Sequence, residues 1–143
     1  MSKPRNKRYR PRQIKVPMTA ASTARLELQW YVHLDGFMRE PTPDRYNHMV
    51  GMVAIVERAM AAQDITDYDV HIRSTKRALL SVCERFEQSG QLRIDRLERA
   101  TLDAGAGFIE AAIKRMRFDT FAVANHETTT EFRRQDAAIS VAA

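Results

Sequence analysis

Residues 42–62 read TPDRYNHMVGMVAIVERAMAA and combine a helix start with an apolar stripe. Thr42 is a favoured N-cap, Pro43 fits the first helical position, and Asp44 complements the positive end of the helix dipole. Apolar side chains then recur at the three- and four-residue spacing of a helix with one buried face, at Tyr46, Met49, Val50, Val53, Val56 and Met60. The stretch predicts a helix that ends near Ala62.

Two further helices are predicted on either side of this one. The first covers about Thr23 to Met38, is capped by Ser22 or Thr23, and ends before the prolines that follow. The next is capped by Thr66 and closes at Gly90, because glycine is favoured just past a helix end. Their apolar faces are Leu26, Trp30, Leu34 and Phe37 in the first, and Ile72, Leu79, Cys83 and Phe86 in the second.

The last third of the chain predicts two more helices. Asp95 and Glu98 have the spacing of a capping box, so a helix should begin at Arg96. It has two apolar faces, which indicates a central helix: Leu97, Ala104, Phe108 and Ala111 on one, and Leu102, Ile109, Ile113 and Met116 on the other. Its Gly105 and Gly107 predict the close approach of another helix. A fifth helix follows Asp119, with Phe121, Ala124, Thr128 and Phe132 as its face.

No stretch alternates with the period of a strand, so the predicted fold is all-α. The chain has 143 residues, of which 44 % are apolar and 29 % charged, as expected of one globular domain. We expect a compact bundle of about five helices over residues 18–143, preceded by an extended basic N-terminal arm over residues 1–17. No apolar run approaches the roughly 20 residues that a membrane span needs, so we expect no membrane partner.

The first sixteen residues, MSKPRNKRYRPRQIKV, contain seven Lys and Arg and no acid. The chain has 23 Lys and Arg and 18 Asp and Glu, so removing these seven leaves 16 cations against 18 acids in the remainder. All of the net positive charge therefore lies in the arm. Pro4 and Pro11 oppose a helix there, and the like charges repel one another, which favours an extended segment.

Clustered Lys and Arg on an extended segment suit a phosphate backbone, because binding releases condensed counterions. Tyr9 lies between Arg8 and Arg10, where its ring could stack on an exposed base. The predicted nucleic-acid-binding residues are Lys3, Arg5, Lys7, Arg8, Tyr9, Arg10, Arg12 and Lys15. Three other basic groups would extend this surface if several of them lay beside the arm: Arg73, Lys76 and Arg77; Arg93, Arg96 and Arg99; and Lys114, Arg115 and Arg117. The charge does not distinguish DNA from RNA, and an acidic protein surface is an alternative partner.

The arm carries two resemblances. Arg8–Arg12 is similar to the Arg-Gly-Arg-Pro core of AT-hook peptides, but Tyr9 stands where that family has Gly, so no minor-groove role is carried over. Lys7–Arg12, KRYRPR, followed by a short helical body, resembles small uncharacterised proteins encoded by phages and prophages of Gram-negative bacteria. This resemblance implies a cytoplasmic protein in a phage-infected or lysogenic bacterium, and it implies no known activity.

Other functional classes have weaker signals. The Ser89–Asp95 connection invites a helix-turn-helix, but the helices and the turn are longer than in that motif. His33, His48, His71 and His126 are scattered, and Cys83 lies on an apolar stripe that predicts a core position. The chain has no HExxH motif, no EF-hand loop and no phosphate loop, so we predict no metal, no cofactor and no enzymatic activity.

The sequence thus favours a small non-enzymatic regulator that acts at a nucleoprotein complex such as a transcription machine. The arm would bind nucleic acid, and the helical body would bind an intracellular protein. The alternative is a protein-binding inhibitor or adaptor of a host defence or regulatory factor, with the arm docking on an acidic protein surface.

Overall fold

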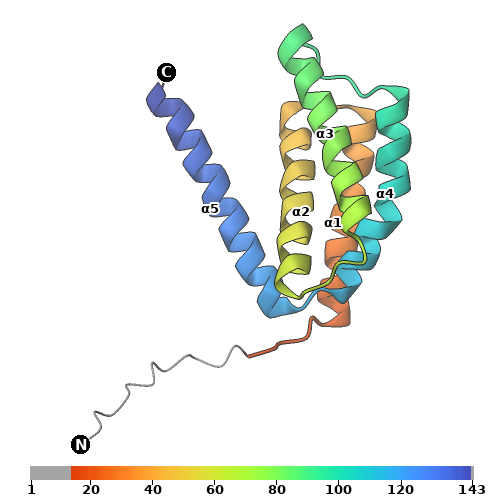
Figure 1. The fold of residues 1–143 in the computed structure, drawn as a ribbon, viewed down its shortest axis with the longest axis vertical. Helices are drawn as coiled ribbons and strands as arrows, with labels where there is room; N and C mark the ends of the chain where they lie inside the picture. Colours follow the sequence, from red (N-terminus) through yellow and green to blue (C-terminus); the bar gives the residue numbers. More distant parts are fainter. Residues whose placement is uncertain (1–13, 143) are drawn as a thin grey trace, which may run out of the picture.

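The computed structural model describes the backbone of residues 14–142 and the side chains of residues 14–135. It contains five helices and, within that range, no strand, which confirms the all-α prediction (Figure 1). The helices are α1 (Ala20–Arg39), α2 (Pro43–Ala62), α3 (Asp69–Ser89), α4 (Arg96–Arg115) and α5 (Phe118–Ala142). None of the described helices is both long enough and apolar enough to cross a bilayer.

Helices α1 to α4 run alternately up and down and form a closed four-helix bundle (Figure 1). In the described chain α5 packs on α2 alone, so α2 is the helix that contacts all four others. The two apolar faces of α4 predicted a central position for this helix, and that prediction was wrong. One of the two apolar faces of α4 remains at the surface, where Leu97 is 76 % exposed and Phe108 is 40 % exposed.

The core is one cluster that all five helices supply. Trp30 and Phe37 of α1 are fully buried, as the apolar spacing of that helix predicts. The indole Nε1–H of Trp30 donates a hydrogen bond of 3.2 Å to the carbonyl of Ala106, which joins α1 to α4. The other buried apolar residues of the core include Met49, Val53, Val56, Met60, Leu79, Val82, Leu102, Ile109 and Ile113.

Several helix ends form where their sequence signals predict. The Thr42 hydroxyl accepts a hydrogen bond from Arg45 N–H at the start of α2. Asp95 and Glu98 form both hydrogen bonds of the capping box at the start of α4. Gly90 ends α3 in the left-handed region, with φ of 70°, which glycine adopts without strain.

Two predicted caps were wrong. Helix α1 begins earlier than expected, because Thr19, the first capping residue after Pro17, accepts the hydrogen bond from Ser22 N–H. Helix α3 begins later than expected. The Thr66 carbonyl accepts a hydrogen bond from Asp69 N–H in a turn, and the helix starts after Tyr68 without a side-chain cap.

The two glycines of α4 have different surroundings. A Cβ atom on Gly105 would collide with the hydroxyl of Thr75, so α3 approaches α4 closely at this point, as predicted. Gly107 is exposed and has open space around its Cα, so the prediction of a close helix contact there was wrong. The physical reason is direction, since residues two positions apart on a helix point to different sides.

Helix α5 packs on α2 through a narrow face. Ala124 and Thr128 are buried and Phe121 and Phe132 are half-buried, which confirms the predicted face. Thr120 is also buried. The hydroxyl oxygens of Thr120 and Thr128 have no hydrogen-bond partner, and an unpaired buried hydroxyl destabilises the contact that contains it.

Replacing Thr128 with Val should therefore raise the free energy of unfolding by about 1 kcal/mol, because Val keeps the branched shape and removes the unpaired hydroxyl. Chemical denaturation followed by circular dichroism measures the change. Thr129→Val is the matched control, because Thr129 is exposed and its hydroxyl is open to water. Equal effects at the two positions would contradict the prediction.

Candidate functional site

The predicted nucleic-acid-binding residues lie almost entirely outside the described part of the chain. The predicted residues that lie outside it are Lys3, Arg5, Lys7, Arg8, Tyr9, Arg10 and Arg12. Lys15 is described, and its side chain is exposed in the extended segment before α1. The assignment of the arm to nucleic acid therefore stays a prediction. The structure does show where the arm joins the bundle.

The end of the arm is hydrogen-bonded to the start of α5. Val16 N–H donates to Asp119 Oδ1 at 3.0 Å, and Phe118 N–H donates to the Val16 carbonyl at 2.9 Å. Burial raises the pKa of Asp119, but the hydrogen bonds from Val16 N–H and Arg117 outweigh it and hold this pKa below its usual value. The arm thus leaves the bundle at the end where α5 begins (Figure 1).

Three cations at this end of the bundle, at the end of α4 and just after it, are paired with carboxylates. Lys114 Nζ lies 3.2 Å from Glu110 Oε1, and Arg117 Nε lies 3.3 Å from Asp119 Oδ1. Arg115 pairs with Asp67 in the connection before α3. These three cations therefore do not extend the positive surface of the arm as unpaired charges.

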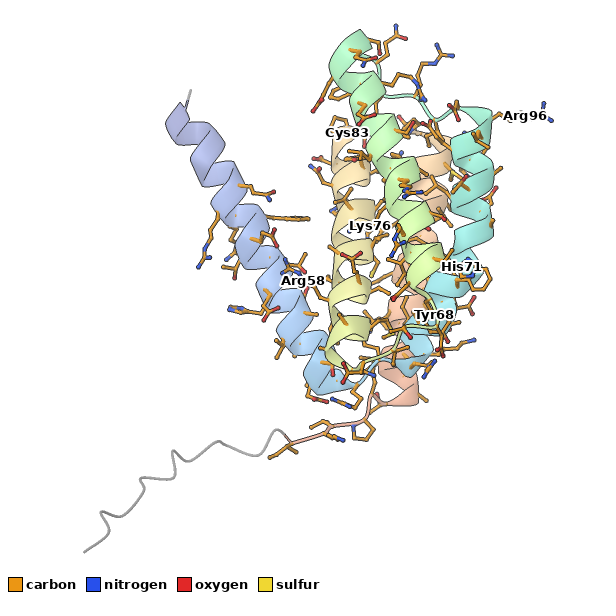
Figure 2. The ribbon with its side chains drawn as sticks, in the orientation of Figure 1. Arg58, Tyr68, His71, Lys76, Cys83 and Arg96 are labelled. Carbon is orange, nitrogen blue, oxygen red and sulfur yellow. The ribbon has the colours of Figure 1, made fainter. Side chains whose placement is uncertain are left out.

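The other basic groups of the bundle are spread along its length. Arg96 is at the opposite end of the bundle (Figure 2). The first half of α3 carries Arg73, Lys76 and Arg77, and Lys76 Nζ lies 2.8 Å from Glu57 Oε2 of α2. Arg73 and Arg77 are exposed and form no ion pair with any residue that the structure describes.

An apolar groove runs between α2 and α3 next to this basic segment. It has a volume of about 380 Å³, and its walls are Tyr46, Val50, Val53, Ala54, Leu79 and Leu80, with Lys76 and Arg77 at the edge. The Tyr46 hydroxyl donates to the Leu79 carbonyl at 3.0 Å, and burial raises the pKa of Tyr46. Leu80 is 56 % exposed. We call this feature the α2–α3 groove.

The α2–α3 groove was not predicted from the sequence. Leu80 follows Leu79 of the predicted buried face, but it points out of that face and received no role. The available signal was the pairing of this extra apolar residue with Lys76 and Arg77 within one helical turn. The apolar partners of Leu80 lie on the preceding helix, α2, and only the fold shows that they are close to it.

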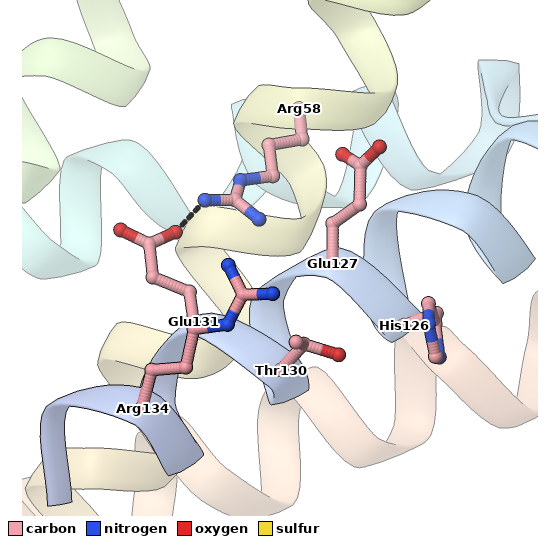
Figure 3. Close-up of a pocket in the computed structure, with 6 residues that line it drawn as sticks. All are labelled: Arg58, His126, Glu127, Thr130, Glu131 and Arg134. Carbon is pink, nitrogen blue, oxygen red and sulfur yellow. Dashed lines mark ion pairs between the residues drawn. The ribbon is translucent and has the colours of Figure 1, made fainter. Parts of the chain in front are cut away.

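A polar hollow of about 610 Å³ lies between α2 and α5 (Figure 3). Arg58 of α2 forms an ion pair with Glu131 of α5, and Glu127 and Arg134 also border the hollow. Two guanidinium groups and two carboxylates balance in charge, so the hollow has no preference for an anion. Its ion pair helps to hold α5 against α2.

Two of the four histidines meet across α1 and α2. The rings of His33 and His48 have centroids 4.9 Å apart, and burial together with the charge of His48 lowers the pKa of His33. His71 stacks on Phe108 at 3.4 Å. Within the described residues, no group of three or more His, Cys, Asp or Glu is arranged to hold a metal ion.

Cys83 was expected in the core and is instead half-buried. Its Sγ lies 3.9 Å from Glu87 Oε1, one helical turn further along α3. Phe86, expected on the same buried face, is 37 % exposed. Both residues lie in the last turns of α3, where its apolar face extends beyond the helices that pack on it.

Comparison of the chain with protein-family models, with curated proteins and with solved structures finds no match.

Proposed function

We propose that the chain is a small non-enzymatic regulator, encoded by a phage or prophage, that acts at a nucleoprotein complex such as a transcription machine in the bacterial cytoplasm. The basic arm binds nucleic acid, and the helical bundle binds a protein of the same complex. This proposal combines the charge of the arm with the surface of the bundle.

The separation of charge between arm and body is the observation that carries the proposal. Seven cations and no acid lie in residues 1–16, whereas the rest of the chain has two more acids than cations. At the end of the bundle where the arm leaves, Lys114, Arg115 and Arg117 are paired with carboxylates. A phosphate backbone therefore meets its strongest attraction in the arm itself.

The test measures binding of the full chain to duplex DNA, single-stranded DNA and RNA across a salt series. A variant with Ala at Arg5, Lys7, Arg8, Arg10 and Arg12 should bind more weakly. Each phosphate contact to duplex DNA contributes about −0.9 to the slope of log K against log salt, so the loss of five contacts should make the slope less steep by about 4.5. Comparing the three nucleic acids shows which form the arm prefers.

A matched control removes five exposed cations from the bundle instead of the arm. Arg25, Arg73, Arg77, Arg93 and Arg96 form no ion pair among the described residues, and their replacement by Ala changes the net charge by the same amount. This control should keep most of the affinity and most of the salt slope. Equal losses in the two variants, or an unchanged slope in the arm variant, would refute the proposal.

The second candidate is a protein-binding inhibitor or adaptor of a host defence or regulatory factor, with the arm docking on an acidic protein surface. The α2–α3 groove favours it, because it is an apolar surface on the bundle with cations at its edge. If the full chain binds none of the three nucleic acids at physiological salt, this second candidate becomes the better one.

A further inference from the structure

We infer that the α2–α3 groove is a docking site for one amphipathic helix of a partner protein, with apolar residues on one face and carboxylates beside them. The inference rests on the proposed function, which assigns protein binding to the bundle, and it names the surface and the chemistry of the partner. It does not depend on what the arm binds.

The length of the groove fits about two turns of a helix. Its α2 wall runs from Tyr46 to Ala54, which spans about 12 Å at the helical rise of 1.5 Å per residue. A helix that lies along it would place apolar side chains at positions i, i+4 and i+7 between α2 and α3. The volume of about 380 Å³ suits a few such side chains.

Where Lys76 and Arg77 line the groove its charges favour an acidic partner, whereas Glu84 lies one turn beyond Leu80 on α3. Arg73 and Arg77 lie one turn apart on the exposed side of α3, and neither forms an ion pair with a described residue. Lys76 is already paired with Glu57 of α2. Two carboxylates one turn apart on the partner helix would match the two free guanidinium groups, because Arg binds carboxylates with directed hydrogen bonds.

Leu80 is the exposed apolar residue that such a helix would cover. It is 56 % exposed and belongs to the wall of the groove. Leu97 on α4 is 76 % exposed and lines none of the hollows described above, so it provides a matched control of the same residue type. Because both side chains are exposed, replacing either with Asp should leave the fold intact.

The probe is a designed, fluorescently labelled helical peptide of about 18 residues, with Leu at i, i+4 and i+7 and Glu on both flanks of this stripe. Fluorescence anisotropy with the full chain measures its affinity. Leu80→Asp should weaken binding by about tenfold or more, because it removes an apolar contact and adds a charge that repels the probe. Leu97→Asp should leave the affinity unchanged.

The basic arm also attracts an acidic peptide, and two controls separate this effect. A peptide with the same charges but Ser in place of Leu should bind at least tenfold more weakly than the probe if the groove supplies the affinity. The arm variant with five Ala residues should keep the difference between wild type and Leu80→Asp, while its association with the probe slows. The salt series described above tests the proposed nucleic-acid function, and the peptide assay tests the groove, so failure of one proposal is distinguishable from failure of the other.

Reversal of the charges at Arg73 and Arg77 gives the test of partner chemistry. The double replacement R73E/R77E should weaken binding of the Glu peptide and strengthen binding of a peptide with Lys in place of Glu. Equal affinity of wild type and Leu80→Asp for the probe, or no binding of the probe at millimolar concentration, would overturn the inference. Binding of oleate at this groove in place of the peptide, lost in Leu80→Asp, would overturn it in favour of a lipid site.

Discussion

Replacing Glu98 with Gln should lower the free energy of unfolding by about 2 kcal/mol at neutral pH, because it breaks a charge-assisted pair of hydrogen bonds whose carboxylate is nearly buried. The Glu98 carboxylate accepts hydrogen bonds from Arg85 Nη1 at 2.8 Å and from Arg85 Nη2 at 2.7 Å. It also accepts one from Asp95 N–H at 2.9 Å, and its side chain is only 5 % exposed. A Gln amide would place its own N–H₂ group against one of these donors.

The effect should depend on pH. Burial raises the pKa of Glu98, but hydrogen bonds, foremost those from Arg85, outweigh burial and hold this pKa below its ordinary value of 4.5. A group whose pKa is lower in the folded state contributes its full stability above the ordinary pKa and loses it as the pH falls through the folded pKa. The difference between wild type and Glu98→Gln should therefore shrink as the pH falls below about 4.5.

Urea denaturation at several pH values, followed by circular dichroism, measures both quantities. Glu84→Gln is the control, because Glu84 is exposed on α3 and forms no ion pair with a described residue. It should change the free energy of unfolding by less than about 0.5 kcal/mol. A Glu98→Gln defect of the same size at pH 3 and pH 7 would show that shape rather than charge holds this helix start.

The helix boundaries were largely predictable because they depend on neighbours in sequence. Thr42 followed by Pro43 admits one plausible start, and so does the capping box of Asp95 and Glu98. Thr19, Ser22 and Thr23 are all able to cap, and local chemistry does not rank them. The Arg85–Glu98 pair joins two helices, and no local rule foretold that Arg85 would reach the capping box.

The central position of α2 was not predictable from apolar spacing. An apolar face is buried only where another helix covers it, and Leu97 and Phe108 have the composition of a core face without a helix over them. The same reason applies to the candidate sites. The charge of the arm can be read without a fold, because charges simply add. The α2–α3 groove arises from apolar residues of two helices that packing leaves partly uncovered.

Replacing Trp30 with Ala should have the largest effect on stability, a loss of about 3–5 kcal/mol in the free energy of unfolding. Trp30 is fully buried and donates a hydrogen bond to the Ala106 carbonyl, so the change opens a cavity between α1 and α4 and removes a bond between them. Trp30→Phe should fall between wild type and Trp30→Ala, because it keeps an aromatic ring and loses the indole N–H.

Circular dichroism is the required signal, because Trp30 is the only tryptophan of the chain and its loss removes the intrinsic fluorescence probe. Leu28→Ala on the same helix is the control, since Leu28 is 65 % exposed and its replacement should cost little. If Trp30→Ala cost no more than Leu28→Ala, α1 would not be a structural part of the core. The α2–α3 groove would then be formed by a smaller unit than the four-helix bundle, because α1 contacts α2 and α4 but not α3.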